Sequence, residues 1–234
     1  MENLKNKADI KVLISDYDFT FYTGEEEIKE NVKKTEEFKR TGNIFVIATA
    51  RNPKSIRKKL EKYNIQCDYV ISYLGGVIEK DEEYIYVCYL KENVVNRIDK
   101  IISKYNNLEI IPMSIKEKPK VDEIIGYKII CENQETLYNI AEEFKDDEYV
   151  WCRVIENELY INNKVHTKVT AINELIEKCD FSKAQIYTVG DFDDDLEMLL
   201  NFNGYRMKNS SELLKENIKN EVSSVGELIE IINK

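Results

Sequence analysis

Two acidic side chains separated by one residue follow the first apolar run of the sequence. The run Lys11–Ser15 leads directly into Asp16 and Asp18. At this spacing on an extended segment, one carboxylate can attack an electrophile while the other transfers a proton. An acidic cluster, Asp191 to Asp195, follows the apolar run Gln185–Val189 in the same way. Carboxylates that gather without histidine or cysteine among them favour a hard cation such as Mg²⁺ over zinc.

Groups suited to a phosphoryl anion occur at the ends of other predicted elements. Thr49 and Arg51 follow the apolar run Ile44–Ala48, and Lys168 lies at the start of the amphipathic segment Thr167–Lys178. Hydroxyls, cationic side chains and the free N–H groups of helix starts all bind phosphate oxygens. Taken singly, these residues have ordinary explanations, such as helix capping by the acids, turn chemistry or a solvent-facing lysine. Their joint occurrence at strand ends favours a site for phosphoryl chemistry.

The elements that position these residues alternate regularly at both ends of the chain. The predicted strands are short apolar runs, at Lys11–Ser15, Ile44–Ala48, Tyr69–Ser72, Gln185–Val189 and Gly204–Met207. The predicted helices are amphipathic or capped, at Glu25–Arg40, Pro53–Tyr63, Thr167–Lys178, Asp193–Leu200, from Ser211 and at Val225–Ile232. This alternation predicts an α/β fold with a Rossmann-like parallel sheet covered on both faces. In such sheets, ligands bind beyond the carboxyl ends of the strands.

The middle of the chain has a different order of elements. From Lys91 to Asn163 the pattern predicts helix, strand, strand, helix, strand and strand, with Tyr149–Ile155 and Glu158–Ile161 forming a hairpin. We therefore expect a small α+β domain at residues 91–163, inserted into a core domain made of residues 1–90 and 164–234.

Composition excludes several classes of partner. The chain has 234 residues, and its 34 basic and 44 acidic side chains give a net charge of −10, which disfavours nonspecific binding to nucleic acid or membrane surfaces. The longest apolar run, Tyr84 to Leu90, is far shorter than the ~18 residues of a membrane span. The polar start Met1–Lys11 lacks a signal-peptide core. Five scattered cysteines without a C-x-x-C pair indicate free thiols. We expect a cytoplasmic protein, a monomer or small homo-oligomer, whose partner is a small phosphorylated metabolite.

The order of the motifs resembles that of a known family over nearly the whole chain. D-x-D-x-T, T-x-R, a lysine and G-D-x-x-D-D are similar to the four motifs of the haloacid dehalogenase superfamily of phosphohydrolases. They lie here at Ser15–Thr20, Ala48–Arg51, Lys168 and Gly190–Asp195. Met207–Ser210 is similar to the M-G-N-A that follows in the Cof-type, or IIB, branch. That branch carries an α+β cap between its second and third motifs, so the resemblance implies that the insert is a substrate-specificity domain.

The resemblance implies a Mg²⁺-dependent phosphatase that hydrolyses a small phosphomonoester, such as a sugar phosphate or phosphoglycolate, through an aspartyl-phosphate. Asp16 would be the nucleophile and a metal ligand. Asp18 would be the general acid and base, and would bind Mg²⁺ through its backbone carbonyl. Asp191 would be the third protein contact to the metal, and Asp195 would support the metal site directly or through water.

The resemblance also implies the groups that hold the phosphoryl anion. Thr49 and Lys168 would bind its oxygens, and Lys168 would also offset charge on Asp16. Arg51 would face the substrate's phosphate or its leaving group. His166, the only histidine, is either a substrate contact or a linker residue.

The sequence departs from the family pattern at three places. Phe19 stands where D-x-D-G-T has glycine, Leu74–Gly76 stands where the branch often has N-G-A, and Asp194 replaces an asparagine. Phe19 is expected to alter the loop beside the nucleophile, and Asp194 to add negative charge near the metal.

Other functions stay open at this stage. A phosphotransferase or phosphomutase would use the same framework, and a non-catalytic phosphate-binding module would be expected to have lost the nucleophile or the acid. A response-regulator receiver also gathers Asp, Thr and Lys around Mg²⁺, but here Thr49 precedes the acidic cluster and an insert intervenes.

Overall fold

The computed structural model describes residues 10–179 and 181–233, so most of the polar start, residues 1–9, lies outside the described part. The chain forms two compact units. Unit 1 runs through Ile85 and resumes at Lys168, and unit 2 is Tyr86–Thr167. Within the described residues, none of the helices is long and apolar enough to cross a membrane.

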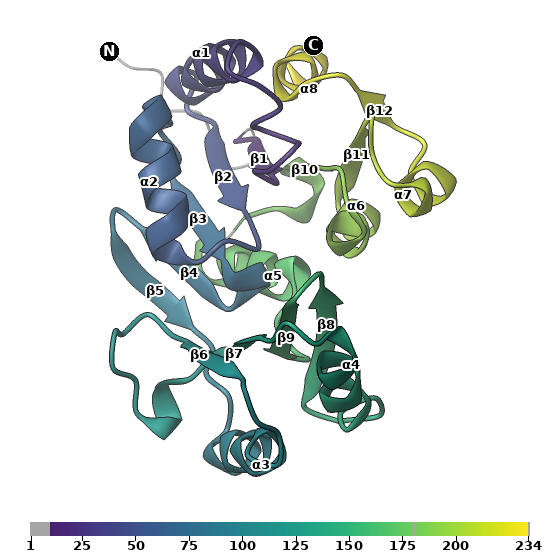
Figure 1. Cartoon of the computed structure of the whole chain (residues 1–234). Coiled ribbons are helices and arrows are strands. Elements are labelled where there is room, and N and C mark those ends of the chain that lie inside the picture. The colour runs from purple at the N-terminus through teal and green to yellow at the C-terminus, as the bar shows by residue number, and fades with distance from the viewer. Residues whose placement is uncertain (1–9, 180, 234) are drawn as a thin grey trace. The chain divides into compact units, whose positions relative to one another are not determined.

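The sheet of unit 1 is mainly parallel. Its strands are β1 (Val12–Ser15), β2 (Ile44–Ala48), β3 (Tyr69–Ser72), β4 (Val77–Lys80), β5 (Glu83–Val87), β10 (Ile186–Gly190), β11 (Asn203–Met207) and β12 (Glu221–Val222). Their spatial order is β12-β11-β10-β1-β2-β3-β4-β5 (Figure 1). β1 lies between β10 and β2 and is parallel to both. The predicted Rossmann-like α/β fold is confirmed.

One edge of this sheet differs from the prediction. β4 follows β3 through the short 3₁₀ turn η2 (Tyr73–Gly75) and runs antiparallel to it. All three turn residues have positive φ angles, of 50° at Tyr73, 57° at Leu74 and 110° at Gly75. This left-handed backbone reverses the chain at once. β4 has the sequence Val-Ile-Glu-Lys, so it lacks the apolar run that marks β3, and the sequence did not predict it.

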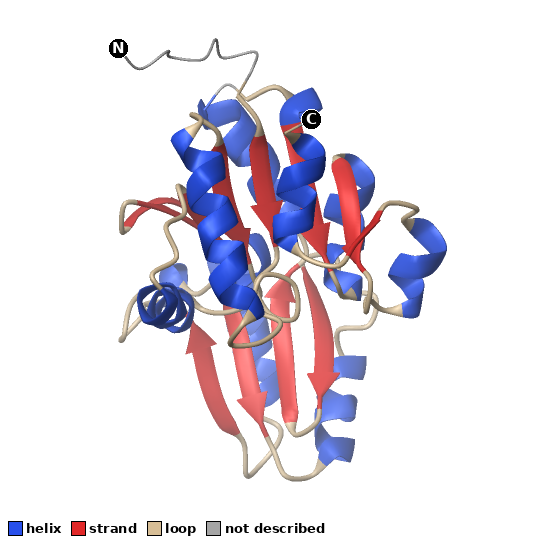
Figure 2. Ribbon diagram, turned by 90° about the horizontal axis from the view of Figure 1, so that it is seen from above, coloured by secondary structure: helices blue, strands red, loops and turns tan. Residues whose placement is uncertain are grey.

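Helices cover both faces of this sheet, as Figure 2 shows. They are α1 (Glu27–Arg40), α2 (Pro53–Tyr63), α5 (Lys168–Cys179), α6 (Leu196–Asn201), α7 (Glu212–Asn217) and α8 (Val225–Ile232), with the 3₁₀ turns η4 (Lys183–Gln185) and η5 (Asp193–Asp195). α1 packs against α2 and α8, and α5 packs against α6. Ile28 and Phe38 of α1 are fully buried in the core with Leu13 and Phe45 of the strands. The helix predicted as amphipathic therefore turns its apolar face to the sheet, and Asn31 is buried on it as well.

Unit 2 is a four-stranded antiparallel sheet with two helices. Its elements are α3 (Glu92–Ile102), β6 (Glu109–Met113), η3 (Val121–Glu123), β7 (Gly126–Ile130), α4 (Gln134–Glu142), β8 (Val150–Ile155) and β9 (Glu158–Asn163). The strand order is β6-β7-β9-β8, and β8 and β9 form the predicted hairpin. Ile98, Leu137 and Leu159 belong to a core cluster of this unit. Unit 2 ends at Tyr86 and Thr167, a few residues outside the expected range of 91–163.

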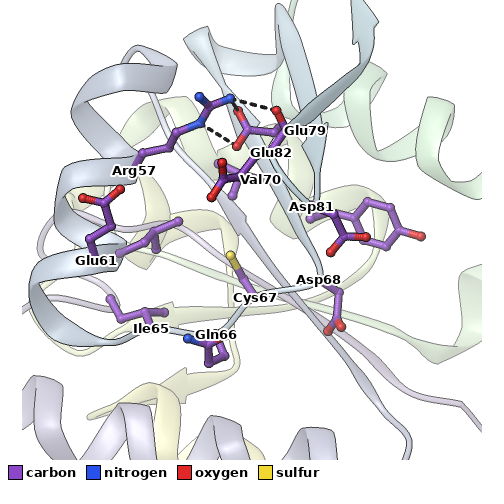
Figure 3. Close-up of a pocket in the computed structure, with 12 residues that line it drawn as sticks. Arg57, Glu61, Ile65, Gln66, Cys67, Asp68, Val70, Glu79, Asp81 and Glu82 are labelled. Atoms are coloured by element: carbon purple, nitrogen blue, oxygen red, sulfur yellow. Dashed lines mark hydrogen bonds and ion pairs between the residues drawn. The ribbon is translucent and has the colours of Figure 1, made fainter.

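A cavity of about 220 Å³ lies in unit 1 beside α2 and β4 (Figure 3). We call it the Cys67 cavity; it is lined by Arg57, Leu60, Glu61, Ile65, Gln66, Cys67, Asp68, Tyr69, Val70, Glu79, Asp81 and Glu82. Arg57 donates two hydrogen bonds to Glu79, from Nε at 2.7 Å and from Nη2 at 2.5 Å, and so ties α2 to β4. Burial raises the pKa of the Cys67 thiol to about 12, so this sulfur stays neutral.

Candidate active site

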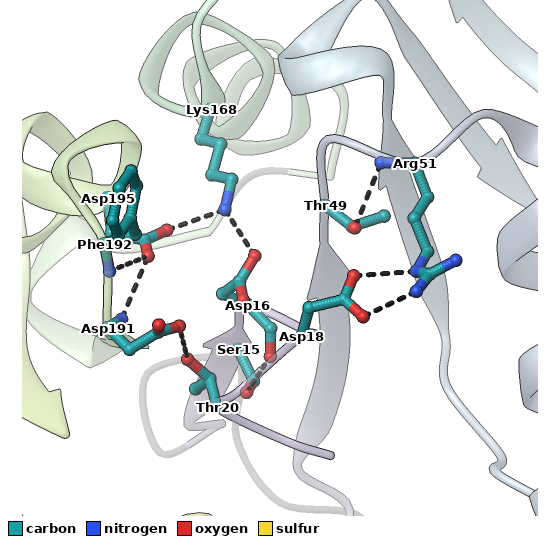
Figure 4. Close-up of polar contacts among 10 residues, drawn as sticks. All are labelled: Ser15, Asp16, Asp18, Thr20, Thr49, Arg51, Lys168, Asp191, Phe192 and Asp195. Carbon is teal, nitrogen blue, oxygen red and sulfur yellow. Dashed lines mark hydrogen bonds and ion pairs between the residues drawn. The ribbon is translucent and has the colours of Figure 1, made fainter. Parts of the chain in front are cut away.

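The strand ends bring the predicted site residues together. Ser15 of β1 pairs in register with Ile47 of β2 and with Val189 of β10. Asp16 and Asp191, which follow β1 and β10, are therefore placed at the same edge of the sheet (Figure 4). The backbone N–H of Asp16 donates to the Val189 carbonyl at 3.0 Å, which fixes the start of the loop after β1.

Lys168 bridges two of the predicted acids. Its Nζ lies 2.6 Å from Oδ1 of Asp16 and 2.6 Å from Oδ1 of Asp195. The lysine is the first residue of α5 and is only 4% exposed. One ammonium therefore compensates two buried carboxylates.

Burial shifts the pKa values of the side chains in this cluster. Burial lowers the pKa of the Lys168 ammonium, but Asp16 and Asp195 outweigh it and hold that pKa above its ordinary value. Burial raises the pKa of the Asp16 carboxyl, and Lys168 opposes this effect. Burial also raises the pKa of Asp191, to about 6. These carboxylates carry more negative charge than the single lysine can neutralise, and an additional cation would stabilise the excess.

Asp195 also holds the loop after β10. Its Oδ2 accepts hydrogen bonds from the backbone N–H groups of Asp191 at 3.0 Å and Phe192 at 3.1 Å. A Cβ atom at Gly190 would come within 2.3 Å of Asp195 Cγ. Glycine is required there because the carboxylate occupies the space of a side chain. Asp195 thus positions both Lys168 and Asp191.

Asp191 is held in place by the loop after β1. Thr20 Oγ1 donates to Asp191 Oδ1 at 2.6 Å, and so connects the first and last predicted motifs. Asp193 is directed elsewhere, because its Oδ1 accepts from Ser211 Oγ, the N-cap of α7. The acidic cluster is therefore divided between the site and the neighbouring helix.

Phe19 has a left-handed backbone conformation. Its φ angle is 60°, in the left-handed region that glycine enters freely and other residues enter at a cost of about 1–2 kcal/mol. Its N–H donates to the Tyr22 carbonyl at 2.9 Å. The loop therefore turns at Phe19, and the ring of Phe19 is 77% exposed.

Arg51 contacts another predicted site residue directly. Its Nε and Nη2 donate to the two carboxylate oxygens of Asp18 at 2.7 and 2.6 Å (Figure 4). Its Nη1 donates to Ser55 Oγ at 3.1 Å. The sequence led us to expect Arg51 to face a substrate, and it did not predict this pair or Ser55. A pairing of side chains 33 residues apart leaves no local signal.

Thr49 and its loop are fixed by backbone contacts. Thr49 is buried, and its Oγ1 accepts from the N–H of Arg51 at 3.2 Å. The N–H of Leu74 donates to the Thr49 carbonyl at 3.1 Å, so the Leu74 departure still supports this loop through its main chain. His166 is also buried, and burial lowers its pKa to about 4.

These loops enclose a cavity of about 270 Å³ within unit 1. We call it the carboxylate cavity; it is lined by Asp16, Asp18, Phe19, Thr49, Ala50, Lys168, Asp191, Phe192, Asp194 and Asp195. Of the predicted site residues, Asp16, Asp18, Thr49, Lys168, Asp191 and Asp195 line it. The sequence did not single out Phe192, and no polarity signal marks it.

The donor atoms fit a hard cation. Asp16, Asp191 and Asp195 each offer a carboxylate oxygen, and these three oxygens lie within 4.8 Å of one another. All-oxygen donors suit Mg²⁺ rather than zinc. The Asp18 carboxylate lies outside this group and is bound by Arg51.

Comparison with known proteins identifies the class. A family model for haloacid dehalogenase-like hydrolases matches residues 13–119 and 109–227. The chain therefore belongs to the haloacid dehalogenase-like hydrolases, and within them to the Cof-type branch. No curated protein matches it in sequence.

Solved structures of low sequence identity share the fold. A haloacid dehalogenase-like hydrolase from Bacteroides thetaiotaomicron is 19% identical, with a TM-score of 0.81 over 96% of this chain and 100% of its own. A protein from Thermotoga maritima is 20% identical, with a TM-score of 0.79 over 96% and 98%. A structure from a phosphoryl-transfer superfamily, described with a trigonal-bipyramidal intermediate, is 17% identical, with a TM-score of 0.72 over 96% and 98%.

Proposed function

We propose that this protein is a Mg²⁺-dependent phosphatase that hydrolyses a small phosphomonoester through an aspartyl-phosphate on Asp16. The observation that carries the proposal is the buried bridge from Lys168 to Asp16 and Asp195, at 2.6 Å each, beside the converging oxygens of Asp191. Membership in the hydrolase family and similarity to a phosphoryl-transfer structure support it.

The charges of the carboxylate cavity suit attack on phosphorus. Lys168 opposes the effect of burial on Asp16 and orients its carboxyl group, and it places positive charge where phosphoryl oxygens would lie. Thr49 adds a hydroxyl to the lining of the same cavity. Mg²⁺ held by Asp16, Asp191, Asp195 and the backbone carbonyl of Asp18 would neutralise charge on the phosphoryl group.

In this proposal Asp16 and Asp18 carry the reaction. An Asp16 oxygen bonds to phosphorus as the bond to the leaving oxygen breaks, and protonated Asp18 gives that oxygen its proton. Water then attacks phosphorus while Asp18 takes a proton from it. The bond to Asp16 breaks, inorganic phosphate leaves, and Asp16 returns as a carboxylate while Asp18 is again protonated.

Arg51 controls when Asp18 is available. The guanidinium holds both Asp18 oxygens, so Asp18 must release at least one of them and take up a proton before it can donate to a leaving group. Oxygens of an incoming phosphate compete for the same guanidinium, because Arg binds phosphate and carboxylate in the same bidentate geometry. In this proposal Arg51 exchanges Asp18 for substrate on binding.

Unit 2 takes the role of a substrate-specificity domain in this proposal. Its antiparallel sheet and two helices have their own buried cluster, so it is a compact unit with its own core. Its side chains would contribute to the choice among small phosphomonoesters.

The test is phosphate release from a panel of small phosphomonoesters, with and without Mg²⁺. The variant is Asp16→Asn, and the matched control is Asp193→Asn, which lies in the acidic cluster but does not line the carboxylate cavity. We expect release that needs both Mg²⁺ and Asp16 and that survives Asp193→Asn. Transfer to an added alcohol in place of release would indicate a phosphotransferase. Binding of phosphate without any turnover would indicate a binding module.

A further inference from the structure

Two exposed aromatic rings belong to the loops that carry the acids. Phe19 is 77% exposed and Phe192 is 47% exposed. Both line the carboxylate cavity, with Ala50 as a further apolar contributor. They come from the loops after β1 and β10, which are adjacent strands of the sheet. The cavity therefore has buried charges at its base and phenyl rings at accessible positions.

Phe19 combines an exposed ring with a strained backbone conformation. Its φ of 60° carries a cost that glycine would avoid. An exposed phenyl ring also leaves apolar surface in water. Neither feature stabilises the fold, so the ring has no evident structural purpose. Strained residues and exposed apolar surface beside a reactive group are both typical of ligand contacts.

Phe192 is held in place without strain of this kind. Its N–H donates to the buried carboxylate of Asp195 at 3.1 Å, which fixes the backbone next to Asp191. The side chain then stands beside the acids in Figure 4. A ring on a fixed backbone loses little conformational entropy when a ligand packs against it.

We propose that Phe19 and Phe192 select phosphomonoesters whose leaving group is a flat apolar or aromatic ring close to the ester oxygen. This inference rests on the proposed phosphatase function and specifies its substrate class. A ring buries apolar area against the two phenyl groups and gains from offset or edge-to-face contact. A polyol would lose water from its hydroxyls at the same positions and find no hydrogen-bond partner in a phenyl ring.

The experiment compares benzyl phosphate with n-propyl phosphate. Both are alkyl phosphomonoesters, so the comparison isolates the ring from the reactivity of an aryl leaving group. The quantity measured is the ratio of kcat/KM for benzyl phosphate to that for n-propyl phosphate. We expect a ratio of about ten or more in the wild-type protein, the size of effect that aromatic contacts produce.

The variants assign the ratio to the rings. Phe19→Gly, which suits the left-handed backbone, should lower the ratio about fivefold or more, and Phe192→Ala should lower it similarly. Phe19→Tyr should retain it, because the ring remains. Tyr138→Ala removes an exposed aromatic side chain from α4, outside the lining of the carboxylate cavity, and should leave the ratio unchanged.

The outcomes separate this inference from the proposed function. A wild-type ratio near one, or a ratio unaffected by Phe19→Gly and Phe192→Ala, overturns the selection of rings while phosphatase activity stands. Turnover of other panel members but of neither probe also overturns it. Absence of Mg²⁺-dependent turnover for the whole panel overturns the proposed function, and this inference fails with it.

Discussion

The carboxylate cavity and the Cys67 cavity belong to the same unit, have similar volumes, about 270 and 220 Å³, and are both rich in acids. They differ in how the acids are neutralised. In the Cys67 cavity, the buried Glu79 has its own guanidinium from Arg57, and Glu61, Asp81 and Glu82 are exposed (Figure 3). Exposed acids of this kind are solvated and need no partner.

In the carboxylate cavity, by contrast, a single lysine serves two buried carboxylates. The oxygens of Asp16, Asp191 and Asp195 lie within 4.8 Å of one another, and this is the group within the described residues that is arranged to hold a metal. The number of acids therefore does not mark a reactive site. Convergent, buried and incompletely neutralised charge marks it, because such charge is costly until a cation or substrate arrives.

The strongest test of this difference is a pair of isosteric substitutions. Asp16→Asn removes the nucleophile, and we expect phosphate release to fall at least about a thousandfold, as it does when a covalent nucleophile is lost. Glu79→Gln makes the same change of charge in the Cys67 cavity and should alter activity by no more than about twofold. Steady-state phosphate release measures both. Equal losses from the two variants would mean that the cavities do not differ as described.

Stability should also respond more strongly in the carboxylate cavity. Lys168→Met leaves two buried carboxylates without a counter-charge, and we expect the metal-free protein to lose about 3–5 kcal/mol of unfolding free energy. Arg57→Met affects one pair whose arginine is partly exposed, so its loss should be smaller. Urea unfolding without Mg²⁺ gives both values. A larger loss for Arg57→Met would mean that the Cys67 cavity, and not the carboxylate cavity, depends more strongly on its cation for stability.

The pH dependence of Mg²⁺ binding should separate the cavities further. The folded pKa of Asp191 is about 6. Below that pH a proton occupies the carboxylate and competes with the cation. From the titration of Asp191 we expect affinity to be about tenfold weaker at pH 5 than at pH 7, since each pH unit below the pKa costs a factor of about ten.

Calorimetric titration with MgCl₂ at several pH values tests this. Asp191→Asn should bind Mg²⁺ weakly and lose the pH step near 6, and Glu61→Gln in the Cys67 cavity should change neither property. An unaltered pH step in Asp191→Asn would show that another group controls the titration.

The smallest expected effect concerns backbone strain, which the two cavities share. Phe19 has a φ of 60° in one lining and Glu82 has a φ of 66° in the other. Substituting glycine relieves about 1–2 kcal/mol of strain at each and adds about 0.4–1 kcal/mol of unfolded-state entropy. Phe19→Gly and Glu82→Gly should therefore each raise stability by up to about 1.5 kcal/mol in thermal or urea unfolding. Destabilisation by Phe19→Gly would mean that the ring makes a structural contact.

Local signals in the sequence account well for the regular elements of unit 1. The helix predicted at Pro53–Tyr63 has those bounds in the structure, because Asn52 caps its first turn and Asn64, with a φ of 52°, ends it. The strand Ile44–Ala48 is likewise confirmed. Cap residues and apolar runs act over a few positions, so they can be read without the fold.

The sequence was less informative where partners are distant. β12 has two residues and pairs with β11, and a strand of that length has no periodicity. The bidentate pair of Arg51 with Asp18 and the exposure of Phe19 and Phe192 depend on how separate loops meet. Side-chain directions at loop tips are fixed by neighbours from other parts of the chain.

The sequence by itself therefore determined the family, the α/β frame and which acids follow β1 and β10, because residue types and short spacings carry that information. Only the tertiary structure decided that Lys168 lies between Asp16 and Asp195, that Asp195 occupies the space of a side chain at Gly190, and that Arg51 binds Asp18. The physical reason is that charge balance and close contact depend on distance in space, which spacing along the chain does not specify.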